Sequence, residues 1–188
     1  YQLSLLTALL LFVAVGVARS NISLSSGFIT HDEGVYFLSA LLSQEQGSFI
    51  ATYGERQPFQ FTLYLFCSIL GIRDVFSFMR YGEIIPITSV CAAVYILSRI
   101  LKRLDFSDRI IGLTLLSMPL LFVFPLTSAF ILSESPALLF TVLGFYLLIE
   151  GLKRERKLFT LFAFISLALG SSLRETFLLY TALGFMIL

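Results

Sequence analysis

The chain alternates between long runs of apolar residues and short segments that hold most of its charges. An α-helix needs roughly 20 apolar residues to cross the hydrocarbon core of a bilayer, and several runs approach this length. We therefore expect a series of membrane-spanning helices. The predicted spans lie near residues 2–18, 77–101, 109–126, 135–150 and 158–173, and a further span begins near 175.

One long connection, residues 19–76, separates the first two predicted spans and contains two shorter helical patterns. In the first pattern, Val35, Leu38 and Leu42 recur at the spacing of one helix face. The second, "FQFTLYLFCSILG", is apolar and ends at Gly71, a residue type that commonly terminates helices. Both patterns are too short to cross a bilayer. We expect two helices that lie in or near the membrane interface.

The composition places the chain among multi-pass membrane proteins. Of its residues 57% are hydrophobic and only 13% are charged, with a mean hydropathy of +0.92, whereas a soluble domain is usually about 25% charged. The predicted fold class is an all-α transmembrane helical bundle, with membrane lipid and no nucleic acid as a partner. Cys67 and Cys91 both lie in apolar stretches, where a thiol usually serves packing. The chain starts at Tyr1 and stops inside an apolar run, so we expect residues 1–188 to be the N-terminal part of a larger protein.

The basic residues of two short loops predict the orientation in the membrane. Segment 99–109, "RILKRLDFSDR", and segment 153–157, "KRERK", each carry four Lys or Arg. Short loops rich in Lys and Arg remain on the cytoplasmic side. Two predicted spans separate these loops, so both can lie on that side. It follows that 19–76, 127–134 and 174–175 lie on the external or lumenal side.

The ionisable residues outside these loops come from separate segments that this topology sends to the external side. Charges near a bilayer are costly unless they pair with one another or line a wet cavity. Their gathering on one side therefore favours a functional site. Its candidate residues are Asp32, Glu33, Arg56, Glu134 and Arg174.

The stretch "THDE" also has a purely structural interpretation. Thr30 at a helix cap and Glu33 three residues later form the pattern of a capping box. Acids at this position also interact favourably with the positive end of a helix. His31 is compatible with a surface position and with a metal ligand.

The other candidates have structural interpretations as well. Glu134 precedes Ser135 and Pro136, a typical helix start that an acid favours. Arg174 beside Glu175 is compatible with a local ion pair. Arg56 is compatible with a contact to a lipid headgroup.

Several motifs in order along the chain resemble one known family. They are "HDEGVYFLSALL" after the first span, "YGERQPFQFTLYLF", "CSILGIRDVFSFMRYGEIIP", "LSESPALLF" at the fourth span, and "KRERKLF" with "SSLRETFLL" around the fifth. The set is similar to the N-terminal half of the GT-C membrane glycosyltransferases of the family 39-like group. That group includes protein O-mannosyltransferases and the bacterial lipid A aminoarabinose transferase.

The resemblance implies a reaction and a place for it. Such enzymes move a sugar from a polyprenyl- or dolichyl-phosphate donor to a protein, lipid or glycan acceptor, with inversion at the anomeric carbon. The reaction takes place on the external face of a prokaryotic plasma membrane, or on the lumenal face of the endoplasmic reticulum in a eukaryote.

The same resemblance assigns roles to the candidate residues. Asp32 matches the general base that deprotonates the acceptor, and Glu33 would support Asp32 or touch the acceptor. Arg56 and Arg174 would contact the donor phosphate. Glu134 matches an acidic position that binds acceptor, sugar or a divalent cation, and the sequence does not decide among these three. The chain reads Arg56-Gln57-Pro58 where the family often reads basic-Pro-Pro.

Two other functions remain open at this stage. The first is a transporter or flippase of a lipid-linked or anionic substrate, but transporters tend to place charges near the bilayer midplane and to contain repeats. The second is a non-catalytic membrane scaffold, which does not require acids on three separate external segments. The positions of the charges favour the glycosyltransferase over both.

Overall fold

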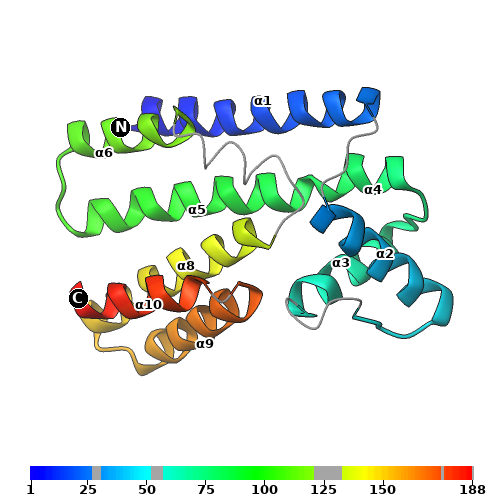
Figure 1. Ribbon diagram of the computed structural model, residues 1–188. Coiled ribbons are helices and arrows are strands. Elements are labelled where there is room, and N and C mark those ends of the chain that lie inside the picture. The colour runs from blue at the N-terminus through cyan, green and yellow to red at the C-terminus, as the bar shows by residue number, and fades with distance from the viewer. Residues whose placement is uncertain (27–30, 52–56, 121–132, 175, 188) are drawn as a thin grey trace.

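The computed structural model describes residues 1–188 except 27–30, 52–56, 121–132, 175 and 188 (Figure 1). Every element in the described residues is a helix, which confirms the predicted all-α class. The elements are α1 (Gln2–Ser26), α2 (His31–Gln46), α3 (Gln57–Leu70), α4 (Val75–Gly82), α5 (Ile84–Arg103), α6 (Asp108–Ser117), the short 3₁₀ helix η1 (Met118–Leu120), α8 (Glu134–Arg154), α9 (Lys157–Leu173) and α10 (Thr176–Ile187).

Helices α1, α5, α6, α8, α9 and α10 lie side by side, and α2, α3 and α4 gather at one end (Figure 1). Helix α1 packs against α5 and α6, and α5 packs in turn against α8. Helices α8, α9 and α10 form a second group in which α8 contacts α9 most extensively. Helices α2, α3 and α4 lie together beyond the ends of α8 and α9, and we call this the loop end of the molecule.

Two described helical stretches are long and apolar enough to cross a membrane. One is Val75–Arg103, which joins α4 and α5, and the other is α8. Glu83 lies between α4 and α5 with helical dihedral angles, φ −66° and ψ −15°, so the chain continues almost without a break. Shorter apolar helices cover Gln2–Ala18 and Lys157–Leu173.

Some helix ends differ from those expected. Helix α1 continues past the apolar run 2–18 to Ser26, because apolarity marks the part of a helix that would sit in lipid and not the helix end itself. The predicted span 109–126 begins as α6 and continues into η1, and its remainder lies outside the described residues. The connection 127–134, predicted to be external, also falls mostly outside them.

Aromatic and aliphatic side chains at the loop end form one core. Tyr36 of α2 and Phe59 of α3 meet edge to face with ring centroids 5.0 Å apart, and both are almost fully buried. The same cluster includes Phe78 of α4, Ala137 of α8 and Leu173 of α9. The helices of the long connection therefore pack directly onto the ends of α8 and α9. A second core, among α1, α5 and α6, includes Phe12, Val94 and Ile111.

Small residues allow α8 and α9 to approach closely. A Cβ added at Gly144 would lie 2.6 Å from Leu167 Cγ, and one added at Gly170 would lie 3.0 Å from the carbonyl oxygen of Ala137. Ser166 Oγ donates a hydrogen bond to the carbonyl oxygen of Phe140 at 2.7 Å. Close packing through Gly and Ser is typical of helix pairs in membranes.

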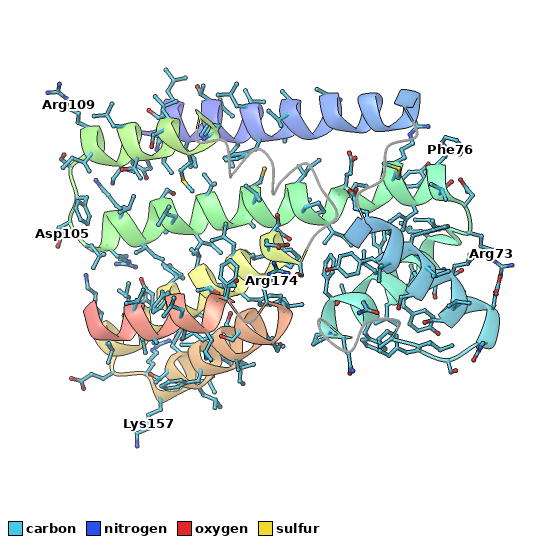
Figure 2. All side chains as sticks on the ribbon, in the orientation of Figure 1. Arg73, Phe76, Asp105, Arg109, Lys157 and Arg174 are labelled. Carbon is cyan, nitrogen blue, oxygen red and sulfur yellow. The ribbon has the colours of Figure 1, made fainter. Side chains whose placement is uncertain are left out.

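The two basic turns lie together at the opposite end of the molecule, which we call the basic end. Glu150 of α8 is 3% exposed and forms two ion pairs: its Oε1 lies 2.5 Å from Arg103 Nε of α5, and its Oε2 lies 2.7 Å from Arg154 Nε. Lys153 Nζ also donates to the carbonyl oxygen of Arg103. The α5–α6 and α8–α9 turns thus share one end of the bundle, as the charge pattern predicts. Figure 2 shows Asp105, Arg109 and Lys157 around this end.

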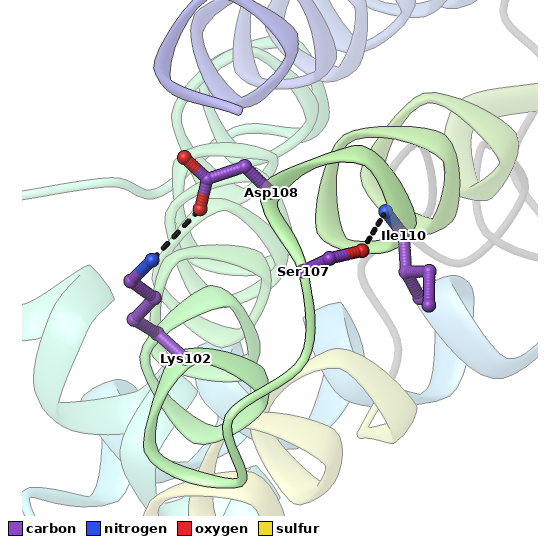
Figure 3. Close-up of polar contacts among 4 residues, drawn as sticks. All are labelled: Lys102, Ser107, Asp108 and Ile110. Atoms are coloured by element: carbon purple, nitrogen blue, oxygen red, sulfur yellow. Dashed lines mark hydrogen bonds and ion pairs between the residues drawn. The ribbon is translucent and has the colours of Figure 1, made fainter.

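Local hydrogen bonds define the α5–α6 turn (Figure 3). Asp105 has a positive φ of 58° just after α5 ends. Ser107 caps α6, and its Oγ accepts a long hydrogen bond of 3.5 Å from Ile110 N. Lys102 Nζ donates to Asp108 Oδ1 at 2.8 Å, and this partner lowers the pKa of the Asp108 carboxyl. The turn therefore neutralises part of its own charge.

Candidate functional site

The described residues among the five site candidates all lie at the loop end. Glu33 is on α2, Glu134 begins α8, and Arg174 follows α9. Asp32 is the second residue of α2, and its side chain lies outside the described part of the structure. Arg56 lies outside the described residues altogether.

Glu134 and Arg174 form an ion pair between two helix ends. Arg174 Nη2 lies 3.1 Å from Glu134 Oε1, and the two side chains are 21% and 24% exposed, respectively. Figure 2 shows Arg174 at the end of the α8–α10 group that faces α2 and α3. The alternative partner considered from the sequence, Glu175, lies outside the described residues. The pair joins segments that the sequence analysis treated separately.

Polar atoms without described hydrogen-bond partners occur beside this pair. Arg174 Nη1 is buried and has no partner among the described residues, although Nη2 is paired. Ser133 Oγ is likewise buried without a described partner, and it makes no side-chain cap bond to α8. Native structures leave few buried donors unsatisfied. A buried guanidinium nitrogen of this kind is suited to an anionic oxygen.

Glu33 is fully buried at the loop end. Its exposed fraction is 0%, and it lies on the same face of α2 as Tyr36 and Ala40, which are both core residues. Its role, supporting Asp32 or touching the acceptor, stays a prediction. The cap proposed for this helix, Thr30, lies outside the described residues, although α2 does begin at His31.

Two further buried polar residues lie in this part of the chain. Glu83, between α4 and α5, is 2% exposed, and Gln60 of α3 is 0% exposed. The sequence analysis did not single out Gln60, because an amide inside an apolar run has no periodic signal. The one available sign that Gln60 is buried was its position next to the apolar face formed by Phe59, Leu63 and Cys67.

Hydrogen bonding at the start of α4 favours the ionised form of one carboxylate at the loop end. Asp74 caps this helix, and its Oδ1 accepts from Ser77 N at 2.9 Å. This bond lowers the pKa of Asp74 below its ordinary value of 3.8. Asp74 is thus committed to helix capping and is not one of the site candidates.

The described residues contain no group of three or more His, Cys, Asp or Glu side chains that could hold a metal ion. The side chains of His31 and Asp32 lie outside that search, so a divalent cation stays a prediction.

Fold and charge distribution together define an integral membrane protein built of helices, with ionisable side chains gathered at one end of the bundle. A sequence model of one family, described as dolichyl-phosphate-mannose-protein mannosyltransferase, matches residues 59–188. The chain belongs to this family of membrane glycosyltransferases, which confirms the resemblance found in its motifs. No curated protein and no solved structure gives a significant match.

The matched segment begins in α3 and includes every later helix. It contains Glu134 and Arg174, whereas Asp32, Glu33 and Arg56 precede it. The roles predicted for all five residues stay predictions.

Proposed function

We propose that the protein transfers a sugar from a polyprenyl- or dolichyl-phosphate donor to an acceptor on the external or lumenal side of the membrane. The observation that carries this proposal is Arg174 at the loop end, held by Glu134 and presenting a buried Nη1 without a described partner. In a family of mannosyltransferases, an anionic oxygen of the donor phosphate is the natural acceptor for that nitrogen.

The reaction assigns the general base to Asp32. Its carboxylate takes the proton of an acceptor hydroxyl or amine as the acceptor attacks the anomeric carbon. The new glycosidic bond forms while the bond from that carbon to the phosphate oxygen breaks, so the configuration inverts and polyprenyl phosphate leaves. The burial of Glu33 supports a role in holding the start of α2 in place.

Two arginines would stabilise the leaving phosphate. Arg174 supplies the nitrogen described above, and Arg56 would supply a second cation from the connection before α3. Charge-assisted hydrogen bonds from guanidinium to phosphate are short, directional and roughly twice as strong as neutral ones. Donors already in place stabilise the charge that develops on the departing oxygen without reorganising during the reaction.

The direct role predicted for Glu134, binding acceptor, sugar or a divalent cation, stays a prediction. Its described contact is with Arg174. The partners proposed for the whole protein are membrane lipid, a lipid-linked sugar donor and a protein, lipid or glycan acceptor. The proposed location is the plasma membrane of a prokaryote, or the endoplasmic reticulum of a eukaryote, with the loop end outside or in the lumen.

The substitution Asp32→Asn tests the assignment of the base. We expect it to abolish sugar transfer from polyprenyl-phosphate mannose, because an amide cannot accept the acceptor proton. Membrane insertion and expression should stay at wild-type levels. The measurement is transfer of radiolabelled mannose in membranes that contain equal amounts of each protein.

A matched control is Asp74→Asn, which keeps an oxygen to cap α4 and should leave transfer near the wild-type rate. Wild-type transfer by the Asp32→Asn variant would remove Asp32 from the mechanism. If the wild-type protein instead moved the lipid-linked sugar between leaflets without transferring it, the flippase alternative would replace the proposed function.

A further inference from the structure

We infer that Glu134 is a positioning residue, which orients Arg174 toward the phosphate of the lipid-linked donor. This inference rests on the proposed function and adds to it a specific task for the acidic residue at the start of α8. Its basis is the ion pair of 3.1 Å between Glu134 Oε1 and Arg174 Nη2.

The backbone alone does not fix the direction of the Arg174 side chain. Arg174 ends α9 in an extended conformation, φ −154° and ψ 114°, at the break between α9 and α10. Its N donates to the carbonyl oxygen of Gly170, and its own carbonyl oxygen accepts from Phe177 N. These bonds fix the main chain, but a long flexible side chain at a helix break needs a partner of its own to stay in one place.

The packing of α8 against α9 holds Glu134 at the distance this task requires. Gly170, one turn before Arg174, lies against the carbonyl oxygen of Ala137, one turn after Glu134. A Cβ at position 170 would be only 3.0 Å from that oxygen, so the two backbones are in direct contact. The two helix ends are therefore held in a fixed relation, which keeps the Glu134 carboxylate within reach of the Arg174 guanidinium.

Because the guanidinium is rigid, the contact of Nη2 with Glu134 also orients Nη1. The nitrogens of Arg lie in one plane in a rigid fork, so fixing Nη2 on Glu134 also limits the direction of Nη1. Nη1 is buried and has no hydrogen-bond partner among the described residues. With the anchor in place, this nitrogen is already aimed when a phosphate oxygen arrives, and less side-chain freedom is lost on binding.

The test compares Glu134→Gln with a control on the same helix. The control, Glu150→Gln, removes the other arginine-paired carboxylate of α8, which lies at the basic end far from the site. For each protein in detergent we would measure the KM for polyprenyl-phosphate mannose, kcat, the thermal midpoint and the binding of polyprenyl monophosphate without sugar.

We expect Glu134→Gln to raise the donor KM and to weaken polyprenyl monophosphate binding about tenfold, because loss of a charged anchor costs on that order. Glu150→Gln should lower the thermal midpoint and leave the donor KM within about twofold of the wild type. An unchanged donor KM and unchanged phosphate binding in Glu134→Gln would overturn the inference.

A charge exchange separates positioning from a structural ion pair. The double variant Glu134→Arg/Arg174→Glu keeps opposite charges at the two helix ends, so it should recover the wild-type thermal midpoint. We expect donor binding to remain lost, because the carboxylate at position 174 repels phosphate. Recovery of donor binding in this variant would show that only the pairing matters and would overturn the inference.

The phosphate measurement also keeps this inference separate from the proposed reaction. Binding of polyprenyl monophosphate that depends on Glu134 and Arg174, in a protein that transfers no sugar, would refute the transferase and support the positioning role. Sugar transfer that Glu134→Gln does not change would support the transferase and refute the positioning role.

Discussion

Glu134 and Arg174 become neighbours only because α8 and α9 fold back against each other. Their shared end of the helical bundle could be predicted from the sequence, since each stands near the end of a predicted span on the same side of the predicted topology. Their pairing could not, because it depends on the rotation and depth of two packed helices. The sequence around an isolated acid or an isolated arginine does not show which residue will be its partner.

Cys67 was interpreted from the sequence as a thiol that serves packing, and the structure supports this interpretation. It is 1% exposed in the core at the loop end, and burial raises the pKa of its thiol from 9.0 to about 11. At pH 8 this shift lowers the reactive thiolate fraction about a hundredfold. The free cysteines of the described chain thus include one that reports on whether α3 stays packed.

We predict that Cys67 resists alkylation while the loop end is folded. In a Cys91→Ser variant, iodoacetamide at pH 8 should label Cys67 at least about a hundredfold more slowly in mild detergent than in denaturant. The measurement is mass spectrometry of the labelled fraction against time. Labelling at equal rates in both conditions would mean that α3 does not pack against α2 and α4.

At the scale of elements, the helices were largely predictable and their junctions were not. Helices α8 and α9 occupy the runs 135–150 and 158–173, because charged turns bound both runs. Helix α3 occupies most of the apolar stretch that ends at Gly71. In contrast, the brief interruption at Glu83, where the chain passes from α4 to α5 with helical dihedral angles, could not be predicted, because apolar periodicity carries no signal for it.

The glycine contact between α8 and α9 gives the sharpest test at this scale. Gly170→Ala would place its Cβ 2.5 Å from Thr141 Oγ1 and 3.0 Å from the carbonyl oxygen of Ala137, and a backbone carbonyl cannot move aside cheaply. We expect a loss of about 1–3 kcal/mol in the free energy of unfolding, measured by thermal or denaturant unfolding in detergent.

A control for this substitution lies two residues earlier in the chain. Ala168→Val adds more volume than Gly170→Ala, but it does so on an exposed face of α9 and should change stability little. Equal destabilisation by both substitutions would contradict the close α8–α9 contact as its cause.

At the scale of the whole molecule, the two basic turns lie at one end, and the ion pair of Glu134 and Arg174 lies at the other. Glu150 ties α5 to α8 at the basic end through Arg103, and Lys153 adds a bond to the same turn. The charge count of two short loops was enough to predict that they share an end, since two spans separate them. The ion pairs of Glu150 with Arg103 and Arg154 could not be predicted. Glu150 falls at the polar end of an apolar run, where a charged residue is expected whether or not it has a partner.

Side-specific labelling tests the orientation that this arrangement predicts. In a Cys67→Ser/Cys91→Ser background, a maleimide that cannot cross membranes should label Ser48→Cys in intact cells. The same reagent should reach Arg109→Cys and Lys157→Cys, at exposed sites of the basic end, only after permeabilisation. Labelling of Arg109→Cys and Lys157→Cys from opposite sides would contradict a shared end, and labelling of both from outside would reverse the orientation.

The length of α9 sets a constraint on the bilayer itself. Its 17 residues extend about 26 Å, less than the roughly 30 Å of a typical hydrocarbon core, whereas the 21 residues of α8 extend about 32 Å. A span that falls short of the hydrocarbon thickness is accommodated by local thinning of the membrane. Arg174, at the far end of α9, would then lie in a depression of the outer leaflet. Under the proposed function, a lipid-borne phosphate entering that depression would move toward the bilayer midplane to meet the guanidinium, and donor binding would then depend on the thickness of the surrounding membrane.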